Sequence, residues 1–174
     1  MSKLLKLVLP AFILLSFGYS ANSQNLKINE LIARNASGMV DEFGDDDDWI
    51  EIYNPGSSAV NLAGLYISDT NSTADFFRIP TFNAAKTTVP AQGYLVLWAD
   101  GEPGEGANHL PFKLSNGGEG VYLGELSGGS ISMIDMVEYP KLERDVSYGR
   151  WPDKTGNFML LSDPSPGASN IAVR

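Results

Sequence analysis

Short apolar runs, each bordered by turn-forming residues, constrain the fold of this chain more than any other feature. The run WIEIY (Trp49–Tyr53) is followed by NPGSS, and the run ISMIDMVEY (residues 131–139) is preceded by ELSGGS. No long segment repeats its apolar residues at the 3.6-residue spacing of an amphipathic helix. Several short strands separated by Gly, Pro, Asn, Asp and Ser are typical of a β-sandwich or a small barrel. We therefore expect an all-β domain.

Alternation within these runs predicts which side chains enter the core. The predicted strands are residues 26–33, 49–53, 64–69, 76–80, 93–100, 120–124, 131–139 and 146–151. Residues 93–100 are almost entirely apolar, which predicts a strand in the middle of a sheet. Successive side chains of a strand point to opposite faces, so Ile50 and Ile52 are expected in the core. Glu51 then lies on the other face, either exposed or hydrogen-bonded to a neighbouring strand.

The N-terminal segment predicts export. Residues 1–23 begin with Lys3 and Lys6, continue with an apolar run over residues 7–17, and end in small residues. This order is that of a secretory signal peptide, which we expect to be cleaved after Ser23. The run is shorter than the roughly 20 apolar residues that span a bilayer, although a permanent N-terminal anchor is the alternative. The protein is expected in the periplasm, at the cell surface or outside the cell, with no membrane span after cleavage.

Length and composition limit the number of domains, the covalent links and the classes of partner that this chain can have. Residues 24–174 are expected to form one domain with a core over about residues 26–170, and residues 162–174 are turn-rich, which predicts a strap or a frayed end. The 174-residue chain has no cysteine, which excludes disulfides and a lipid-bearing cysteine, and its formal net charge is −9. Nucleic-acid affinity depends largely on Lys and Arg contacts to phosphates, so we expect no nucleic-acid partner.

The acidic run before WIEIY is a candidate metal site. Asp45, Asp46, Asp47 and Asp48 follow one another, and hard cations such as calcium bind several oxygen ligands on flexible loops. The spacing does not match an EF-hand, because Ile50 stands where that loop needs glycine. Neighbouring side chains of an extended chain point apart, so at most alternate aspartates converge. The alternative is a solvated loop whose last acid orders the entry to the strand.

Catalytic constellations are sparse. His109 is the one histidine and lies in a Gly-rich segment, so we expect it in a surface loop. A zinc site needs three or four His, Cys or acid ligands, and one histidine with no cysteine argues against such a site. Glu30 and Glu51 could meet across strands as the paired carboxylates of a small secreted hydrolase. We keep that activity as an alternative and otherwise expect no enzyme.

Aromatic residues suggest one further binding mode. Trp98, Tyr122 and Trp151 could form a flat platform for sugar rings, as in a calcium-dependent carbohydrate-binding module. The alternative is packing in the core or at strand edges, where aromatic residues at strand spacing usually lie.

These segments together resemble the lamin-tail domain, and the sequence is most similar to the bacterial secreted branch of that family. The resemblance covers almost the whole chain after residue 23, in order. Its pieces are residues 28–35 (INELIARN), 47–69 (DDWIEIYNPGSSAVNLAGLYISD), 78–80 (RIP), 89–101 (VPAQGYLVLWADG), 110–123 (LPFKLSNGGEGVYL), 145–153 (DVSYGRWPD) and the PSPGASN segment.

The resemblance implies a fold and a class of function. It implies an immunoglobulin-like β-sandwich and a non-catalytic binding or structural module, contacting protein or glycan at the cell envelope, without a catalytic residue or cofactor. It implies structural roles for Glu30, Trp49, Glu51 and Arg150, with Arg150 paired to a buried acid such as Glu30 or Glu51. It also implies that Asp47 or Asp48 accepts backbone N–H bonds at the strand entry. The oligomeric state stays open.

Overall fold

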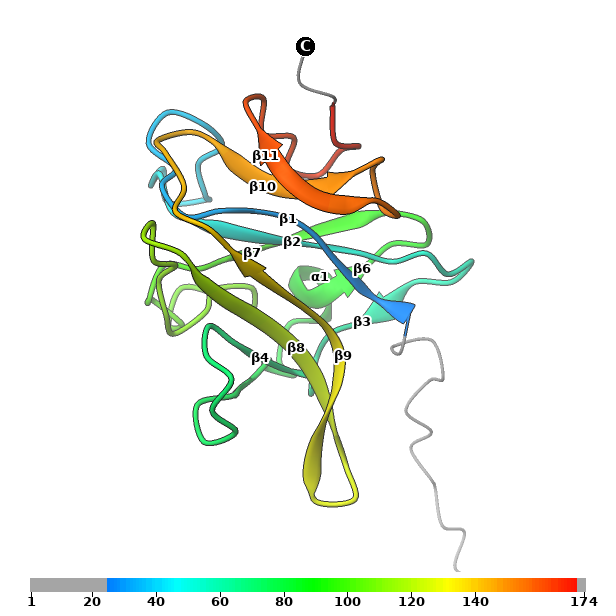
Figure 1. Ribbon diagram of the computed structural model, residues 1–174. Helices are drawn as coiled ribbons and strands as arrows, with labels where there is room; N and C mark the ends of the chain where they lie inside the picture. The colour runs from blue at the N-terminus through cyan, green and yellow to red at the C-terminus, as the bar shows by residue number, and fades with distance from the viewer. Residues whose placement is uncertain (1–24, 172–174) are drawn as a thin grey trace, which may run out of the picture.

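The computed structural model describes residues 25–171 (Figure 1). Its largest sheet has five strands. The predicted leader, residues 1–23, lies outside the described residues. The strand order is β11-β10-β1-β2-β7, and every neighbouring pair is antiparallel. The bounds are β11 (Asn157–Leu161), β10 (Ser147–Trp151), β1 (Lys27–Ile32), β2 (Trp49–Tyr53) and β7 (Tyr94–Trp98).

A second sheet of four strands has the order β5-β4-β8-β9. Its bounds are β5 (Phe77–Arg78), β4 (Tyr66–Ser68), β8 (Glu119–Ser127) and β9 (Ser130–Tyr139). Figure 1 shows β8 and β9 as a long hairpin whose tip extends away from the first sheet. A small pair, β3 (Val60–Asn61) with β6 (Thr88–Val89), and one turn of helix, α1 (Ala84–Thr87), complete the described elements.

The apolar core lies between the sheets, which makes the molecule an immunoglobulin-like β-sandwich. Ile50 and Ile52 are fully buried in it, as the alternation of WIEIY predicts. The second sheet contributes Ile67, Val121 and Leu123 to the same cluster. The predicted fold class is therefore confirmed, since nearly all regular structure is antiparallel strand.

One prediction about the sheet is wrong. Residues 93–100 were expected in the middle of a sheet, but β7 is an edge strand of the five-stranded sheet. Its apolar character has another cause, because both faces of the strand are covered. Leu95 packs against the main core, and Val96 packs against the smaller cluster of Ile32, Trp49 and Trp98.

The segment after β11 crosses the far face of the first sheet as an irregular strap. Ser165 donates hydrogen bonds to Glu30, and the N–H of Gly167 donates to Glu51. No helix among residues 25–171 has the length and apolar character needed to cross a membrane.

Candidate functional site

Asp41 organises the loop that leads into β2. Its Oδ1 accepts hydrogen bonds from the N–H groups of Phe43, Gly44 and Asp45, at 2.8, 2.8 and 2.9 Å. Burial opposes ionisation, but these donors outweigh it, and the pKa of the Asp41 carboxyl is lowered. The second oxygen, Oδ2, is buried and accepts no hydrogen bond from the described chain. This side chain is therefore ionised, with one oxygen still available.

The four aspartates of the acidic run have different surroundings. Asp46 is exposed. Oxygens of Asp45 and Asp47 lie within 4.8 Å of each other and of an Asp41 oxygen, so alternate members converge. Asp48 instead accepts a hydrogen bond from the N–H of Asn35 (3.2 Å), as expected of an acid that orders the strand entry. The four therefore do not form one site.

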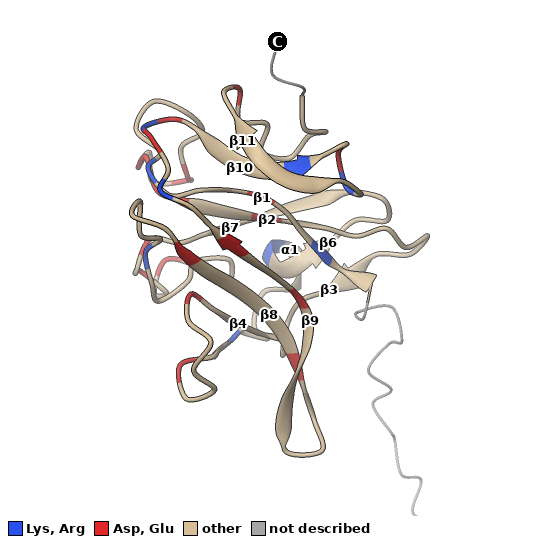
Figure 2. Cartoon of the chain, in the orientation of Figure 1, with Lys and Arg blue, Asp and Glu red and all other residues tan. Residues whose placement is uncertain are grey.

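Burial governs ionisation at the end of this run. Burial, and then the nearby Asp100 carboxylate, raise the pKa of Asp47. Burial likewise raises the pKa of Asp48, to about 6. Figure 2 shows Asp and Glu residues gathered on the loops at one end of the sandwich and along the β8–β9 hairpin.

His109 lies against this loop and is fully buried, so the prediction of a surface histidine is wrong. The Gly-rich segment folds back along β7, and residues Trp98 and His109 form a parallel bridge. Nδ1 of His109 contacts Oδ2 of Asp100, which is also fully buried. The ring packs edge-on to Phe43, with 6.0 Å between ring centroids. Sequence spacing does not predict the contacts of His109 with Asp100 and Phe43, because they depend on how two loops pack.

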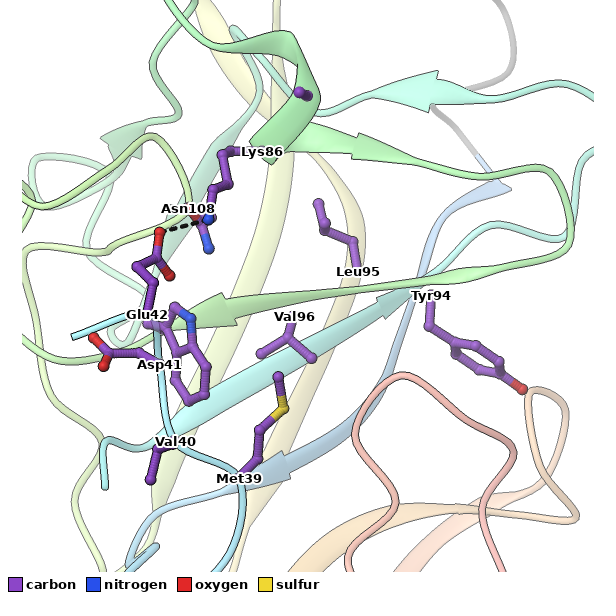
Figure 3. Close-up of a pocket in the computed structure, with 11 residues that line it drawn as sticks. Met39, Val40, Asp41, Glu42, Lys86, Tyr94, Leu95, Val96 and Asn108 are labelled. Atoms are coloured by element: carbon purple, nitrogen blue, oxygen red, sulfur yellow. Dashed lines mark hydrogen bonds and ion pairs between the residues drawn. The ribbon is translucent and has the colours of Figure 1, made fainter. Parts of the chain in front are cut away.

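An open cleft of about 430 Å³ lies beside the same loop. Figure 3 shows Met39 and Val40 on one side, Leu95 and Val96 from β7 on another, and the Lys86–Glu42 ion pair above them. The cleft therefore has an apolar floor with charged residues along its rim.

The sequence profile of the Lamin Tail Domain family matches residues 19–141, which is more than half of the chain. The chain belongs to the lamin tail domain family. A comparison with curated proteins gave no match. Lamin tail domains are immunoglobulin-like modules that are typically not enzymes, which agrees with the sandwich described above.

The paired acids of this lamin tail domain lie under the strap. Glu30 and Glu51 are opposite each other on β1 and β2, and both are fully buried. Glu30 accepts hydrogen bonds from Ser147 and Ser165, whereas Glu51 accepts one from Asn29 Nδ2 (2.9 Å). The strap separates both carboxyls from solvent, so they hold the strap to the sheet and do not line a cleft for a glycosidic bond.

Arg150 has a different partner from the one expected. Its Nη2 donates to Asp135 of β9 at 2.9 Å, and its Nε donates to the carbonyl of Ile28 at 2.8 Å. It therefore pairs with neither Glu30 nor Glu51. Asp135 belongs to the opposite sheet, so Arg150 links the two layers of the sandwich.

The three aromatic residues proposed as a sugar platform do not share one surface. Trp98 and Tyr122 are buried, at 3% and 6% exposure, and lie in different sheets. Trp98 packs with Trp49, which gives Trp49 the structural place expected for it. Trp151, at the end of β10, is 37% exposed. A flat platform of these three is therefore wrong, because two of them are core residues.

Proposed function

We propose that this lamin tail domain is an exported, non-catalytic module that binds an extended segment of a partner protein along β7. Export is inferred from the leader-like residues 1–23. The proposal rests on the part of the outer edge of β7, at Tyr94 and Val96, that lies beside the cleft and has no neighbouring strand within residues 25–171. Proteins that recognise peptides by strand addition present such an edge, and side-chain pockets next to it supply specificity.

Backbone hydrogen bonds show which groups of β7 face outward. Gly93 and Ala99, on either side of the strand, bond to the segments flanking β2. The backbone N–H and C=O of Trp98 face away from β2, because they bond to Asn108 and Leu110. The direction of the backbone groups alternates along an antiparallel strand, so the N–H and C=O of Tyr94 and Val96 also face away from β2. Among the described residues, no backbone hydrogen bond outside the strand pairs involves either of them.

The cleft suits a partner segment with apolar and basic side chains. Met39, Val40 and Leu95 offer apolar surface, and the acidic loop lies directly beside them. Lys86 is held by Glu42, and the whole chain carries a net charge of −9. Opposite charges across an interface speed association and select partners. A basic, extended segment is thus the best match.

Glycan binding receives less support. Trp98 and Tyr122 lie in the core, so the calcium-dependent carbohydrate module loses two of the three aromatic residues on which it depended. The hydrolase alternative also loses support, because Glu30 and Glu51 are buried under the strap. A second copy of the chain could also pair at β7, and the experiment below separates that case.

The test is selection of extended peptides from a random display library, followed by affinity measurement on the wild type, Val96→Ala and Val96→Pro. Both substitutions remove the valine side chain, but only proline removes the outward N–H. Proline is tolerated on an edge strand where the N–H faces away from the sheet. We expect Lys- or Arg-containing peptides whose affinity falls about tenfold in Val96→Pro beyond the loss in Val96→Ala.

Amide chemical shifts of the wild type locate the peptide without any variant. Shifts concentrated on Tyr94 and Val96 support the proposal. Shifts elsewhere, equal affinities of the two variants, or failure to select any peptide above a control protein would contradict it. Sedimentation shows whether the wild type forms a dimer that Val96→Pro abolishes, which would assign the edge to a second copy.

A further inference from the structure

Unpartnered polar atoms gather where the Asp41 loop meets residues 105–109. In the part of the chain that the structure describes, five buried side-chain atoms have no hydrogen-bond partner. They are Asp41 Oδ2, Asp47 Oδ2, Glu105 Oε2, Asn108 Oδ1 and His109 Nε2. Leaving such an atom without a partner destabilises the folded protein, and most buried polar groups in proteins are paired. A cluster confined to two adjoining loops therefore needs a cause.

We propose that Asp41, Glu105 and His109 bind a divalent transition-metal ion. One carboxylate oxygen of each acid and one ring nitrogen of the histidine lie within 4.8 Å of one another. Two ligand atoms at about 2.0–2.2 Å from a common ion lie at most about 4.4 Å apart, which is close to this limit. Two carboxylates and one imidazole form a donor set that suits zinc, manganese, cobalt or iron.

His109 carries this inference because it is fully buried and one of its nitrogens is free. Its Nδ1 contacts the buried carboxylate of Asp100. Histidines that bind metals commonly donate their other ring N–H to a carboxylate, which orients the ring and selects the tautomer. Asp100 then acts as a positioning residue, and Nε2 is the nitrogen left for the ion.

A histidine cation held by acids alone explains the cluster less well. Nε2 lies 3.6 Å from Glu42, and Nδ1 lies 3.6 Å from Glu105, and both distances exceed a hydrogen bond. That arrangement leaves Oδ2 of Asp41 and Oε2 of Glu105 without a donor. A bound ion would satisfy both oxygens and the free nitrogen together.

The neighbouring set of Asp41, Asp45 and Asp47 offers oxygen ligands only, which calcium prefers. Asp45 is exposed, so water can satisfy its carboxylate. Every member of the histidine-containing set is buried or partly buried, whereas the oxygen-only set includes the exposed Asp45, so we favour the histidine-containing set. Metal binding at this site is independent of peptide binding at β7.

The experiment begins with untagged protein freed of metal by a chelator and dialysis. We expect Co²⁺ to produce the visible absorption of a nitrogen- and oxygen-ligated ion, and Zn²⁺ to displace it. An ion that binds only the folded state raises stability, so saturating Zn²⁺ should raise the Tm by about 5 °C. Ca²⁺ at the same concentration should have a smaller effect.

Three variants that each remove one negative charge distinguish the possible sites. Glu105→Gln changes the proposed set alone, and its affinity for Zn²⁺ and Co²⁺ should fall at least about tenfold. Asp45→Asn changes the oxygen-only set alone, and Asp46→Asn changes neither. Both should keep the wild-type affinity for Zn²⁺. The Glu105 side chain is partly exposed, so its substitution leaves the fold intact.

Two results would overturn the inference. One is the absence of Co²⁺ absorption together with an unchanged Tm in Zn²⁺, which would leave His109 with a structural role alone. The other is binding of Ca²⁺ that Asp45→Asn abolishes and Glu105→Gln does not. That result would place the ion on the acidic run.

Discussion

Glu51 is a carboxyl group enclosed by the protein. It is fully buried between β2 and the strap, opposite Glu30, and accepts hydrogen bonds from Asn29 and Gly167. Burial is the dominant effect and raises the pKa of Glu51 from 4.5 to about 8. Burial also raises the pKa of Glu30. At neutral pH the folded protein therefore keeps a proton on Glu51 that the unfolded chain releases.

This difference makes folding depend on pH. The folded pKa of Glu51 lies above its unfolded value, so the stabilisation is complete below pH 4.5 and is lost as pH rises toward about 8. Each pH unit within that window lowers the free energy of unfolding by about 1 kcal/mol. In Glu51→Gln, which cannot ionise, we expect this part of the pH dependence to disappear. Urea unfolding at several values between about pH 5 and about pH 8 measures it.

Glu102→Gln is the matched control, because it also exchanges one carboxylate for an amide but on an exposed residue. Its pH profile should run parallel to that of the wild type. Parallel profiles for the wild type and Glu51→Gln would instead show that Glu51 is ionised in the folded protein, despite its burial.

Single residues differ in how far the sequence determines their place. Ile50 and Ile52 could be placed in the core because strand alternation is a local rule. His109 could not, because its burial depends on Asp100 and on the loop around Asp41, which come together only in the folded chain. Local spacing predicts that Asp45 and Asp47 converge, but it does not predict that both lie close to Asp41.

At the scale of elements, Arg150 and Asp135 join β10 to β9 and so hold the two sheets together. The Arg150 guanidinium also lies over the Phe158 ring, 4.4 Å from its centroid, and Asp135 Oδ2 accepts from the N–H of Ile28 as well. Both charged side chains are mostly buried. Removing one partner of such a pair leaves a charge without compensation.

Arg150→Met should therefore lower the free energy of unfolding by about 3 kcal/mol. Denaturant unfolding of Arg150→Met, Asp135→Leu and the double variant forms a thermodynamic cycle for the pair. We expect the double variant to be less destabilised than the sum of the single variants. Additive effects, or a loss in Arg150→Met of the size seen at an exposed salt bridge, would mean that the link between the sheets contributes little.

The elements also show where sequence patterns give an ambiguous answer. The apolar run of residues 93–100 predicts a strand correctly, but its position in the sheet incorrectly. Such a run indicates that both faces of a strand are covered and does not report whether both edges are paired. For β7 one edge pairs with β2, and Val96 on the other edge borders the cleft. The apolar pattern therefore predicts the strand but does not show that one of its edges is available for binding.

At the scale of the whole molecule, the segment that matches the family ends before the folded unit does. The Lamin Tail Domain profile ends at residue 141, before β10 and β11. Yet β10 pairs with β1 in the centre of the five-stranded sheet, and it carries Ser147, which bonds to the buried Glu30. Without β10, the edge of β1 and the Glu30 carboxyl would lose their partners. The matched segment thus lacks groups that the core requires.

Three chains test this dependence: residues 25–171, 25–161 and 25–141. We expect the longest to unfold cooperatively. The chain ending at Leu161 should fold with a lower Tm, because it keeps β10 but loses the strap donors of Ser165 and Gly167. The shortest should show no cooperative transition, since a buried carboxyl and the edge of β1 would be left unpaired. Circular dichroism during heating distinguishes the three. A cooperative transition in residues 25–141 would show that the second sheet and β1, β2 and β7 suffice, and that β10, β11 and the strap are additions to a smaller stable core.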